Sequence, residues 1–415
     1  MNILFLTLNL PDESGTVANM YYDLITEFRD HGHQVTVMSI WDNNKEVVSK
    51  ENGVDIVRVK TPQTQNVRNL LWKGVAYALL PYNFKKAYKH YLANKHFDWI
   101  FLPTPPITLV SFVSYVKKKS GAKFYLILRD IHPQSAASIG LLKNKLMYNY
   151  LEKRARKGYD IAELIGCMSK GNINYIKSNY PALDGKKLVL LYNWQKAKVK
   201  EKNAGAEGGK EAETAVDVRL KLGLEGKIIA LFGGNIGYGQ RIENLYNLAK
   251  YYKNNPSLCF LVIGKGVMKE ELMRLVDESE LDNVIFLDFM PRNEYLQLVE
   301  SVDIGLISIN EKYNVPTCPS KAVSYMALGI PIFAMINPNN DYGQIIEDAG
   351  AGYWIVGGDF EKADIQKFDQ LVTSKEMRIK AGQNALHFYT ENLTSEIAYN
   401  VILKQISNAK AEQNI

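Results

Sequence analysis

The chain is poor in cysteine, and its three cysteines are scattered. Cys167, Cys259 and Cys318 lie far apart in mixed or apolar stretches, and no pair of them has the spacing of metal ligands. An odd, scattered set of cysteines does not indicate a disulfide framework. An Asp-x-Asp cluster, which could hold a divalent metal, is also absent from the sequence. These absences argue against a disulfide-built scaffold and against a metal site.

The sequence also lacks a long hydrophobic segment and a secretion signal. Its longest uncharged run, Trp99–Val116, contains Pro103, Pro105 and Pro106 near its start and is better explained as strand, loop and helix. The first residues form an apolar strand with no basic region before it and no cleavage site after it. We therefore expect a cytoplasmic protein that does not span a membrane.

Charge is distributed unevenly along the chain. The net charge is +6, but residues 1–195 carry an excess of 11 positive charges and the remainder an excess of five negative ones. Lysine and arginine cluster at residues 85–89, 117–119 and 153–157. Each cluster alone is typical of a solvated helix face. Their concentration in one half favours an anionic partner there, either a nucleic acid or a membrane surface.

Short apolar strands alternate with helix-length amphipathic segments through most of the chain. In the first half, strands are predicted at Ile3–Leu8, Gln34–Ile40, Asp55–Val59, Trp99–Leu102, Lys123–Leu128, Ile165–Met168 and Leu188–Leu191. In the second half, they are predicted at Ile228–Phe232, Cys259–Ile263, Val284–Phe289, Ile304–Ile309 and Ile330–Met335. Near-continuous β-branched runs such as Val35–Ile40 indicate parallel strands covered on both faces. The pattern predicts an α/β protein built from doubly wound sheets.

Residues 195–215 break this alternation, because Lys, Glu, Ala and Gly dominate there without an apolar period. We therefore predict an N-terminal Rossmann-like domain at 1–194, a flexible linker at 195–215 and a C-terminal Rossmann-like domain at 216–390. A C-terminal helix within 391–415 could pack back on the N-terminal domain. Open α/β sheets bind ligands beyond the carboxyl ends of their strands. Two such domains facing across a cleft can therefore hold two substrates.

Two loops lead from a strand end through small residues into a helix, an arrangement that can bind phosphate on backbone N–H groups. The first contains Gly15, and an ordinary capped turn explains it equally well. The second, at 232–241, has four glycines in seven residues, among them Gly234, which Asn235 follows. Arg241 at its end could add a fork of donors. The loop matches neither the phosphate loop of ATPases nor the dinucleotide fingerprint, so NAD is not favoured.

Two lysines also stand at strand ends of the second domain. Lys265 lies between two glycines after the next strand, although a plain turn is a nearly even alternative. Pro319, Ser320 and Lys321 begin a predicted helix. The helix dipole disfavours a cation in the first turn unless an anion is bound nearby, and a diphosphate would supply one. We therefore expect Lys321 to bind phosphate.

Ionisable residues also follow a strand of the first domain. The strand Lys123–Leu128 runs directly into Arg129, Asp130 and His132. In doubly wound folds, active sites lie at such carboxyl ends. Asp130 is the first candidate for the catalytic group and His132 its nearest rival, with Arg129 beside them. The alternative is a structural Arg–Asp pair with a surface histidine.

Taken together, these motifs resemble those of bacterial glycosyltransferase family 4, in the branch that builds O-antigen, capsule and exopolysaccharide repeat units on a polyprenyl lipid. They occur in order along nearly the whole chain, at 129–133, 165–169, 232–237 and 319–331. The resemblance implies a GT-B fold, a nucleotide-diphosphate sugar bound mainly by the C-terminal domain and an acceptor bound by the N-terminal one. It also implies a metal-independent transfer that retains the anomeric configuration.

The chain departs from the usual pattern of that family at two places. Two glutamates of the family, eight residues apart, correspond here to Pro316 and Ser324, and its loop arginine and lysine correspond to Asn235 and Gln240. We expect three other residues to supply the positive charges that the family places at those positions: Arg241, Lys265 and Lys321. The rest of the predicted donor site consists of Gly15, Gly234, Asn235, Pro319, Ser320 and Ser324.

The sequence therefore predicts a glycosyltransferase of the EC 2.4 class that takes a sugar from a nucleotide-diphosphate sugar, most simply a UDP-sugar. The acceptor is a polyprenyl-diphosphate-linked or other saccharide, and neither a metal nor another cofactor is expected. One alternative is a non-catalytic nucleotide-sugar-binding partner of a synthase, which the missing glutamates favour. Another is a nucleotide-sugar epimerase of the same architecture, which would need more acid/base carboxylates than Asp130 alone.

A segment of the first domain has the composition of a membrane-surface helix. Seven apolar or aromatic residues lie just ahead of Lys85, Lys86 and Lys89: Leu70, Leu71, Trp72, Val75, Tyr77, Leu79 and Leu80. Apolar and aromatic groups beside lysines suit an anionic bilayer interface, whereas a helix packed on its own sheet is the alternative. We expect the protein to be peripheral at the inner face of the plasma membrane, where a polyprenyl-linked acceptor is held, and to bind no nucleic acid.

Overall fold

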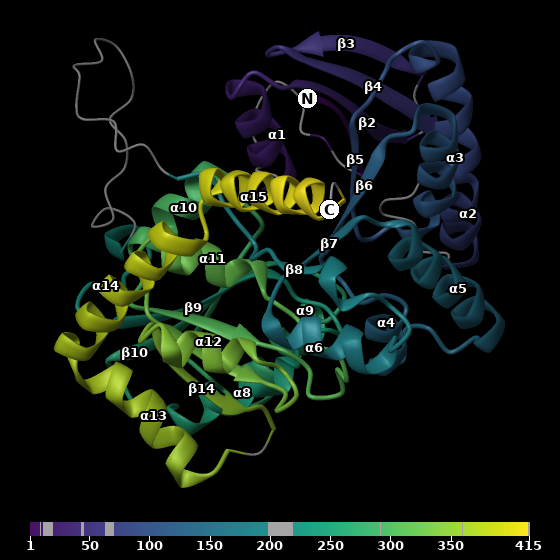
Figure 1. Ribbon diagram of the computed structural model, residues 1–415. Coiled ribbons are helices and arrows are strands. Elements are labelled where there is room, and N and C mark those ends of the chain that lie inside the picture. Colours follow the sequence, from purple (N-terminus) through teal and green to yellow (C-terminus); the bar gives the residue numbers. More distant parts are fainter. Residues whose placement is uncertain are drawn as a thin grey trace. The chain divides into compact units, whose positions relative to one another are not determined.

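The computed structural model describes residues 1–8, 10, 20–42, 45–62, 70–197, 219–290, 292–358 and 360–413. The chain divides into two compact units (Figure 1). Unit 1 comprises Met1–Tyr192 and Ser395–Ile415, and unit 2 comprises Asn193–Thr394. Across the described ranges, every helix is too short or too polar to cross a lipid bilayer.

Unit 1 is built on an eight-stranded sheet in the order β3-β4-β2-β1-β5-β6-β7-β8. Its strands are β1 (Asn2–Thr7), β2 (Gln34–Asp42), β3 (Val47–Glu51), β4 (Val54–Thr61), β5 (Trp99–Pro103), β6 (Lys123–Leu128), β7 (Leu164–Cys167) and β8 (Leu188–Leu190). All neighbouring pairs are parallel except β3–β4, which is antiparallel. The seven strands predicted in this half are confirmed. The edge strand β3 was not predicted, because its mostly exposed residues form no apolar run.

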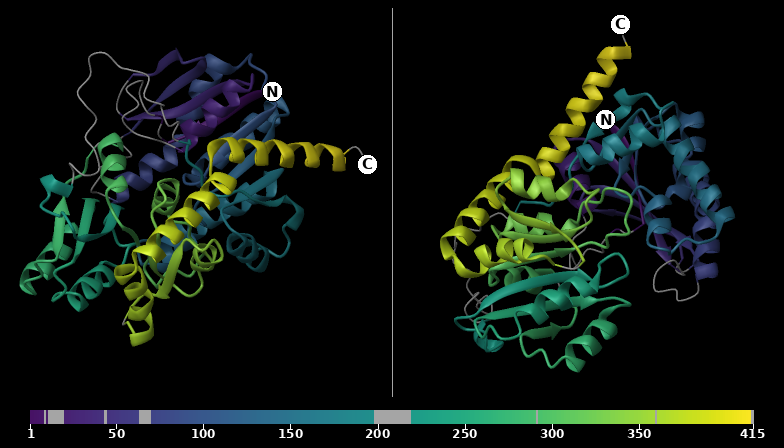
Figure 2. Two further views of the ribbon diagram at one scale, coloured as in Figure 1. Left: turned by 90° about the vertical axis from the view of Figure 1, so that its left-hand side faces the viewer. Right: turned by 90° about the horizontal axis from the view of Figure 1, so that it is seen from below.

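Helices α1 (Met20–Asp30), α2 (Leu70–Ala87), α3 (Val110–Ser120), α4 (Gln134–Ser138), α5 (Lys145–Ile161) and α6 (Lys170–Asn179) complete this part of unit 1. The last helix of the chain, α15 (Ser395–Gln413), yellow in Figures 1 and 2, also belongs to unit 1. Its Ser395 hydroxyl donates to the Glu27 carboxylate of α1 at 2.6 Å. The Tyr125 hydroxyl of β6 donates to the Gln405 side-chain oxygen, also at 2.6 Å. These bonds tie the C-terminal helix to the sheet and to α1.

Unit 2 has a six-stranded sheet in the order β11-β10-β9-β12-β13-β14, with every neighbouring pair parallel. Its strands are β9 (Ile228–Asn235), β10 (Leu258–Lys265), β11 (Val284–Leu287), β12 (Ile304–Ser308), β13 (Ile332–Ile336) and β14 (Gly352–Val356). Its helices are α8 (Ile242–Tyr251), α9 (Lys269–Glu278), α10 (Arg292–Glu300), α11 (Ser320–Ala327), α12 (Tyr342–Asp348), α13 (Lys362–Thr373) and α14 (Lys375–Asn392). The predicted α/β class with two parallel, helix-covered sheets is confirmed. The sequence pattern did not predict β14, α12 or α13.

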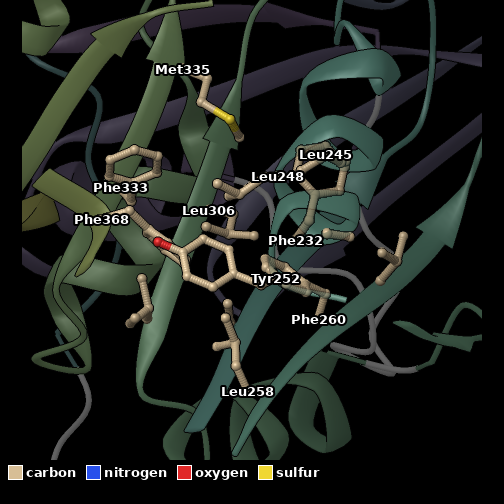
Figure 3. Close-up of a cluster of buried hydrophobic side chains, with 14 of the residues drawn as sticks. Phe232, Leu245, Leu248, Tyr252, Leu258, Phe260, Leu306, Phe333, Met335 and Phe368 are labelled. Carbon is tan, nitrogen blue, oxygen red and sulfur yellow. The ribbon is translucent and has the colours of Figure 1, made fainter. Parts of the chain in front are cut away.

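The core of unit 2 is rich in aromatic side chains (Figure 3). The ring centroid of Phe368 from α13 lies 4.8 Å from that of Phe333 and 5.4 Å from that of Tyr252. Phe232, near the carboxyl end of β9, belongs to the same fully buried cluster. The floor beneath the end of β9 is therefore close-packed and rigid.

Gln195, which the sequence assigns to the start of a linker, is buried within unit 2. Its backbone forms a β-bridge with Thr394, and its N–H donates to the Leu393 carbonyl oxygen at 3.0 Å. Its own carbonyl oxygen accepts from the Tyr389 hydroxyl at 3.0 Å. The structure therefore describes residues 195–197 of the predicted linker, and the rest of the linker lies outside the described residues.

Candidate functional site

The glycine-rich loop of unit 2 leaves the carboxyl end of β9, where β10 pairs with it as far as Lys265. Neither of two glycines on the β10 side has room for a side chain. A Cβ at Gly264 would lie 1.8 Å from the Gly234 carbonyl oxygen, and one at Gly266 would lie 2.1 Å from the Ile236 carbonyl oxygen. The Ile236 N–H donates to the Lys265 carbonyl oxygen at 3.0 Å. The close approach of the two backbones thus requires glycine and fixes this edge.

Gly234 is the point of this loop that a ligand can approach. Its φ of +110° favours glycine, and no heavy atom lies within 4 Å of the position that a Cβ would take. The neighbouring Asn235 is exposed. A bare stretch of backbone at the carboxyl end of a parallel strand is typical of a phosphate-binding edge.

A buried phenol separates β9 from β12 just before this loop. The pairing of the two strands ends at Leu231 opposite Gly305. Beyond that point, the fully buried Tyr325 hydroxyl accepts from the Gly233 N–H at 3.3 Å and donates to the Leu231 carbonyl oxygen at 3.0 Å. The phenol thus gives the buried Gly233 N–H, which lies beyond the last residue of β9 that pairs with β12, an acceptor, and it adds a bond to the Leu231 carbonyl.

Two glycines make room for this phenol and for a second one. A Cβ at Gly305 would lie 2.4 Å from the Tyr325 ring, and one at Gly233 would lie 2.1 Å from the Tyr295 hydroxyl oxygen. The two hydroxyls are hydrogen-bonded, and burial raises the pKa of Tyr295 to about 12, so both phenols stay protonated near neutral pH. Sequence reasoning missed this pair. Its only signal was the occurrence of glycine inside two strand-like runs.

Lys321 lies one helical turn before Tyr325 on α11, and its Nζ is 3.4 Å from the centroid of the Phe232 ring. This nitrogen is buried and has no hydrogen-bond acceptor among the described residues. Burial lowers the pKa of Lys321 to about 7. A buried ammonium without an acceptor is costly, and a cation–π contact offsets only part of that cost. The arrangement therefore holds a cation ready for an anionic ligand.

Arg241 already has an anionic partner. Its Nη1 lies 2.5 Å from Oε1 of Glu311, and both side chains are partly exposed. The loop before it is braced from the segment after β12: the Asn310 N–H donates to the Gly239 carbonyl oxygen at 2.9 Å, and the Asn310 amide donates to the Tyr238 carbonyl oxygen at 3.0 Å. A ligand phosphate must therefore compete with Glu311 for this guanidinium.

The other predicted donor residues have different surroundings. Lys265 is exposed, and its Nζ lies 4.7 Å from the centroid of the Phe289 ring. Pro319 is the N-cap of α11, and Ser320 is exposed. The Ser324 hydroxyl donates to the Gln195 side-chain oxygen at 2.9 Å, so it holds the chain entering unit 2. Gly15 lies outside the described residues.

The carboxyl end of β6 in unit 1 carries the second group of candidates. The Arg129 guanidinium is buried and donates to the carbonyl oxygens of Leu191 at 3.0 Å and Tyr192 at 3.5 Å. The Thr104 hydroxyl accepts from the Arg129 N–H at 3.1 Å. The Arg129 side chain thus fastens the end of β6 to the segment after β8, and its donors are directed at the backbone.

The neighbouring acid and base are partly buried. Burial raises the pKa of the Asp130 carboxyl to about 6 and lowers the pKa of the His132 imidazole. The backbone at Asp130 is anchored, because its carbonyl oxygen accepts from the Thr104 hydroxyl at 3.3 Å. A carboxylate with a pKa near 6 is well suited to proton transfer or hydroxyl activation near neutral pH.

Within the part of the chain that the structure describes, no three His, Cys, Asp or Glu side chains are grouped as metal ligands would be.

Comparison with known families places these features in context. Residues 217–388, which contain the unit 2 edge, match the family model described as glycosyl transferases group 1. The probable glycosyltransferase WbjE of Pseudomonas aeruginosa is 24% identical over 72% of each chain. The putative colanic acid biosynthesis glycosyl transferase WcaI of Escherichia coli is 23% identical over 60% of each chain.

A third relative is named for a lipid-linked substrate. The N-acetylgalactosamine-N,N'-diacetylbacillosaminyl-diphospho-undecaprenol 4-alpha-N-acetylgalactosaminyltransferase of Campylobacter jejuni is 24% identical over 55% of each chain. The chain thus aligns with little more than half of this relative's length.

Solved structures match over almost the whole chain. Sucrose-phosphate synthase from Thermosynechococcus elongatus gives a TM-score of 0.73 at 14% identity, covering 99% of both chains. Anabaena HepE in complex with UDP gives 0.67 at 13% identity, covering 98% of this chain and all of the other. Such low identities show the fold, and the predicted GT-B fold is confirmed. The group 1 domain at 217–388 makes the chain a glycosyltransferase enzyme.

Replacing Lys321 by methionine should stabilise the ligand-free protein. The folded-state pKa of about 7 lies below the ordinary 10.5, so the unfolded chain binds this proton more tightly. The wild-type protein therefore gains stability from this group as the pH rises from about 7 to 10, and the penalty is largest below pH 7. We expect the Tm of Lys321→Met to exceed that of wild type by at least about 2 °C at pH 6, as about 1 kcal/mol produces.

Differential scanning calorimetry at pH 6 and pH 9 checks this expectation, and the gap should narrow at the higher pH. Lys362→Met, at an exposed position at the start of α13, is the matched control and should leave the Tm unchanged. A Lys321→Met protein that is less stable than wild type at pH 6 would show that the ammonium is already well solvated or paired.

Removing the Tyr325 hydroxyl should loosen the end of β9. Tyr325→Phe leaves the buried Gly233 N–H without this acceptor and removes a donor from the Leu231 carbonyl, which should lower the free energy of unfolding by about 1–3 kcal/mol. Urea unfolding measures the change. Tyr251→Phe, on the largely exposed Tyr251, serves as the control and should shift the free energy by less than about 0.5 kcal/mol. Equal stability of the two variants would remove Tyr325 from its assigned role.

Proposed function

We propose that this glycosyltransferase transfers a sugar from a nucleotide-diphosphate sugar to a polyprenyl-linked or saccharide acceptor in surface polysaccharide biosynthesis. The donor is a UDP-sugar, and the transfer retains the anomeric configuration without a metal or other cofactor. One observation carries the proposal above all others. The unpartnered ammonium of Lys321 is buried beside the glycine-lined end of β9, inside the segment that matches the group 1 family.

The diphosphate is the part of the donor that this edge fits. Departure of UDP from the sugar builds negative charge on the leaving phosphate, and fixed cations stabilise that charge most where water is excluded. Lys321 supplies such a cation from the first turn of α11. Lys265, at the end of the neighbouring strand, and the open backbone at Gly234 can contact the same group. Arg241 joins them when the diphosphate displaces Glu311.

Support for UDP and for the acceptor comes from proteins similar to this chain. HepE, which shares its fold, was solved with UDP bound. The Campylobacter relative is named for a diphospho-undecaprenol substrate, and the Escherichia coli relative for colanic acid biosynthesis. We infer a polyprenyl-linked acceptor from these names, and a place of work at the inner face of the plasma membrane, where such an acceptor is held.

In unit 1, Asp130 is the residue that we assign to the chemistry of the acceptor. As a carboxylate with a pKa raised to about 6, it can accept a hydrogen bond from the attacking hydroxyl and take up its proton. His132, with a lowered pKa, is neutral at pH 7 and is the alternative for this role. Arg129 positions the strand end through its two backbone contacts.

The donor site is tested by UDP binding. Lys321→Met and Arg241→Ala should each weaken the affinity for UDP by about 10- to 100-fold, the scale of one charge-assisted hydrogen bond. Isothermal titration calorimetry gives the dissociation constants, and Lys362→Met is again the control. If both variants bind UDP as tightly as wild type does, the diphosphate lies elsewhere. Protein that binds UDP but transfers no sugar from any UDP-sugar would support the non-catalytic alternative.

The acceptor chemistry is tested at Asp130. Asp130→Asn should lower the turnover by about 100-fold and leave the dissociation constant of UDP unchanged, because only a proton-accepting group is lost. The wild-type rate should fall as the pH drops through about 6, where this carboxylate becomes protonated. Release of UDP in the presence of acceptor measures both effects. Asp160→Asn, on an exposed residue of α5, is the control. A nearly normal rate in Asp130→Asn would transfer the role to His132.

A further inference from the structure

Helix α2 of unit 1 is apolar on two neighbouring faces, and only one of them is buried. Ala76, Leu80 and Phe84 point into unit 1 and are almost fully buried. Trp72, Val75, Leu79 and Tyr82 are exposed, and their spacing of three or four residues places them on one face. Trp72 and Tyr82 are each 68% exposed. A helix that is apolar all round normally has protein or lipid against every face.

A second helix extends this exposed face. Leu146, Met147 and Tyr150 are exposed on the first turns of α5, and Leu146 is 81% exposed. The two helices meet there, because Met147 Cε lies 3.9 Å from the position that a Cβ would take at Gly74 of α2 (Figure 1). We call the following seven residues the α2–α5 patch: Trp72, Val75, Leu79, Tyr82, Leu146, Met147 and Tyr150.

Lysines border the α2–α5 patch, and the surrounding sequence contains no acidic residue. Lys86 lies four residues beyond Tyr82 and so continues the exposed face of α2. Lys143 and Lys145 are exposed at the start of α5, although its first turn holds no acidic residue to offset them. No Asp or Glu occurs at 56–97 or at 131–151. Lysines at both helices therefore give this border positive charge, which is complementary to an anionic surface.

The composition of the patch favours a bilayer over a protein as the partner. Lysine is depleted in protein–protein interfaces, whereas lysine beside exposed Trp, Tyr and Leu is characteristic of helices that lie in a lipid interface. Tryptophan and tyrosine rings prefer the level of the lipid headgroups. Lysines bordering such rings then reach the phosphates of anionic lipids.

We propose that the α2–α5 patch docks unit 1 on a bilayer that contains anionic phospholipid. The apolar side chains of α2 and α5 enter the boundary between headgroups and acyl chains, and Lys86, Lys143 and Lys145 contact lipid phosphates. The proposal rests on the proposed function in one respect, since a polyprenyl-linked acceptor never leaves the bilayer and makes such docking useful. The proposal adds the first turns of α5 to the surface that the sequence indicated.

Co-sedimentation with vesicles tests the proposal on the full-length protein. Wild type should pellet with vesicles of phosphatidylcholine and phosphatidylglycerol at low salt, less at high salt, and little with phosphatidylcholine alone. The partition coefficient should fall at least tenfold in each of two double variants, Lys86→Glu/Lys145→Glu and Trp72→Ser/Leu146→Ser. The matched controls in unit 2 change residues that are also exposed and should bind as wild type does: Lys362→Glu/Lys375→Glu and Tyr251→Ser/Ile379→Ser.

The affinity for UDP, measured without vesicles, separates this proposal from the proposed function. Docking variants should bind UDP normally, because the donor site lies in unit 2, and should unfold at the same temperature as wild type, which shows that unit 1 is folded. Wild type that pellets with vesicles but binds no UDP would contradict the donor assignment and leave the docking surface standing. Failure of wild type to pellet at low salt overturns the docking proposal. The docking proposal is also overturned if sedimentation velocity shows a dimer that the Trp72→Ser/Leu146→Ser substitutions dissociate. A second copy of the chain would then cover the patch.

Discussion

The hydroxyl of Tyr325 takes the place of a neighbouring strand at the carboxyl end of β9, and the candidate donor edge depends on it. Because this hydroxyl accepts from the Gly233 N–H and donates to the Leu231 carbonyl, the buried Gly233 N–H keeps an acceptor where β9 leaves its partner β12. The same helix that carries Tyr325 carries Lys321 one turn earlier, so the position of the buried ammonium follows from that of the phenol. The glycine at 305 is required by packing against the phenol ring, and it needs no direct role in binding.

Buried cations with and without partners have different meanings in this protein. Arg129 directly follows β6 and Lys321 lies in the first turn of α11, and the guanidinium and the ammonium are both buried. Arg129 donates to two backbone carbonyls and so stabilises the joint between β6 and the segment after β8. Lys321 has only the face of an aromatic ring, which leaves its hydrogen-bonding capacity unused among the described residues. A charge that destabilises the empty protein in this way is typical of a binding site, where function and stability oppose each other.

Much of the fold could be predicted from the sequence, because long β-branched runs and amphipathic helices carry a strong periodic signal. The signal was absent for β3, which is mostly exposed, and weak for β14, whose residues are only partly buried. The chemistry of single residues was harder to predict, since it depends on partners far away in the sequence. Lys321 could be inferred from its place in a helix. The hydrogen bond between Ser324 and Gln195 could not be predicted, because 129 residues separate the two. The bond between Tyr325 and Gly233 could not be predicted either, because 92 residues separate them.

Unit 1 is assembled from both ends of the chain, and this sets an order on its folding during synthesis. Unit 2, a continuous segment from Asn193 to Thr394, is synthesised in full before α15. Until then, Glu27 lacks the Ser395 hydroxyl, and Tyr125 lacks the Gln405 side chain. Domains normally fold in the order of synthesis, N-terminal first. Here the first sheet to be synthesised is the last to be completed, so a chain that ended near residue 394 would contain every residue of unit 2 and would lack the contacts that α15 gives to α1 and β6.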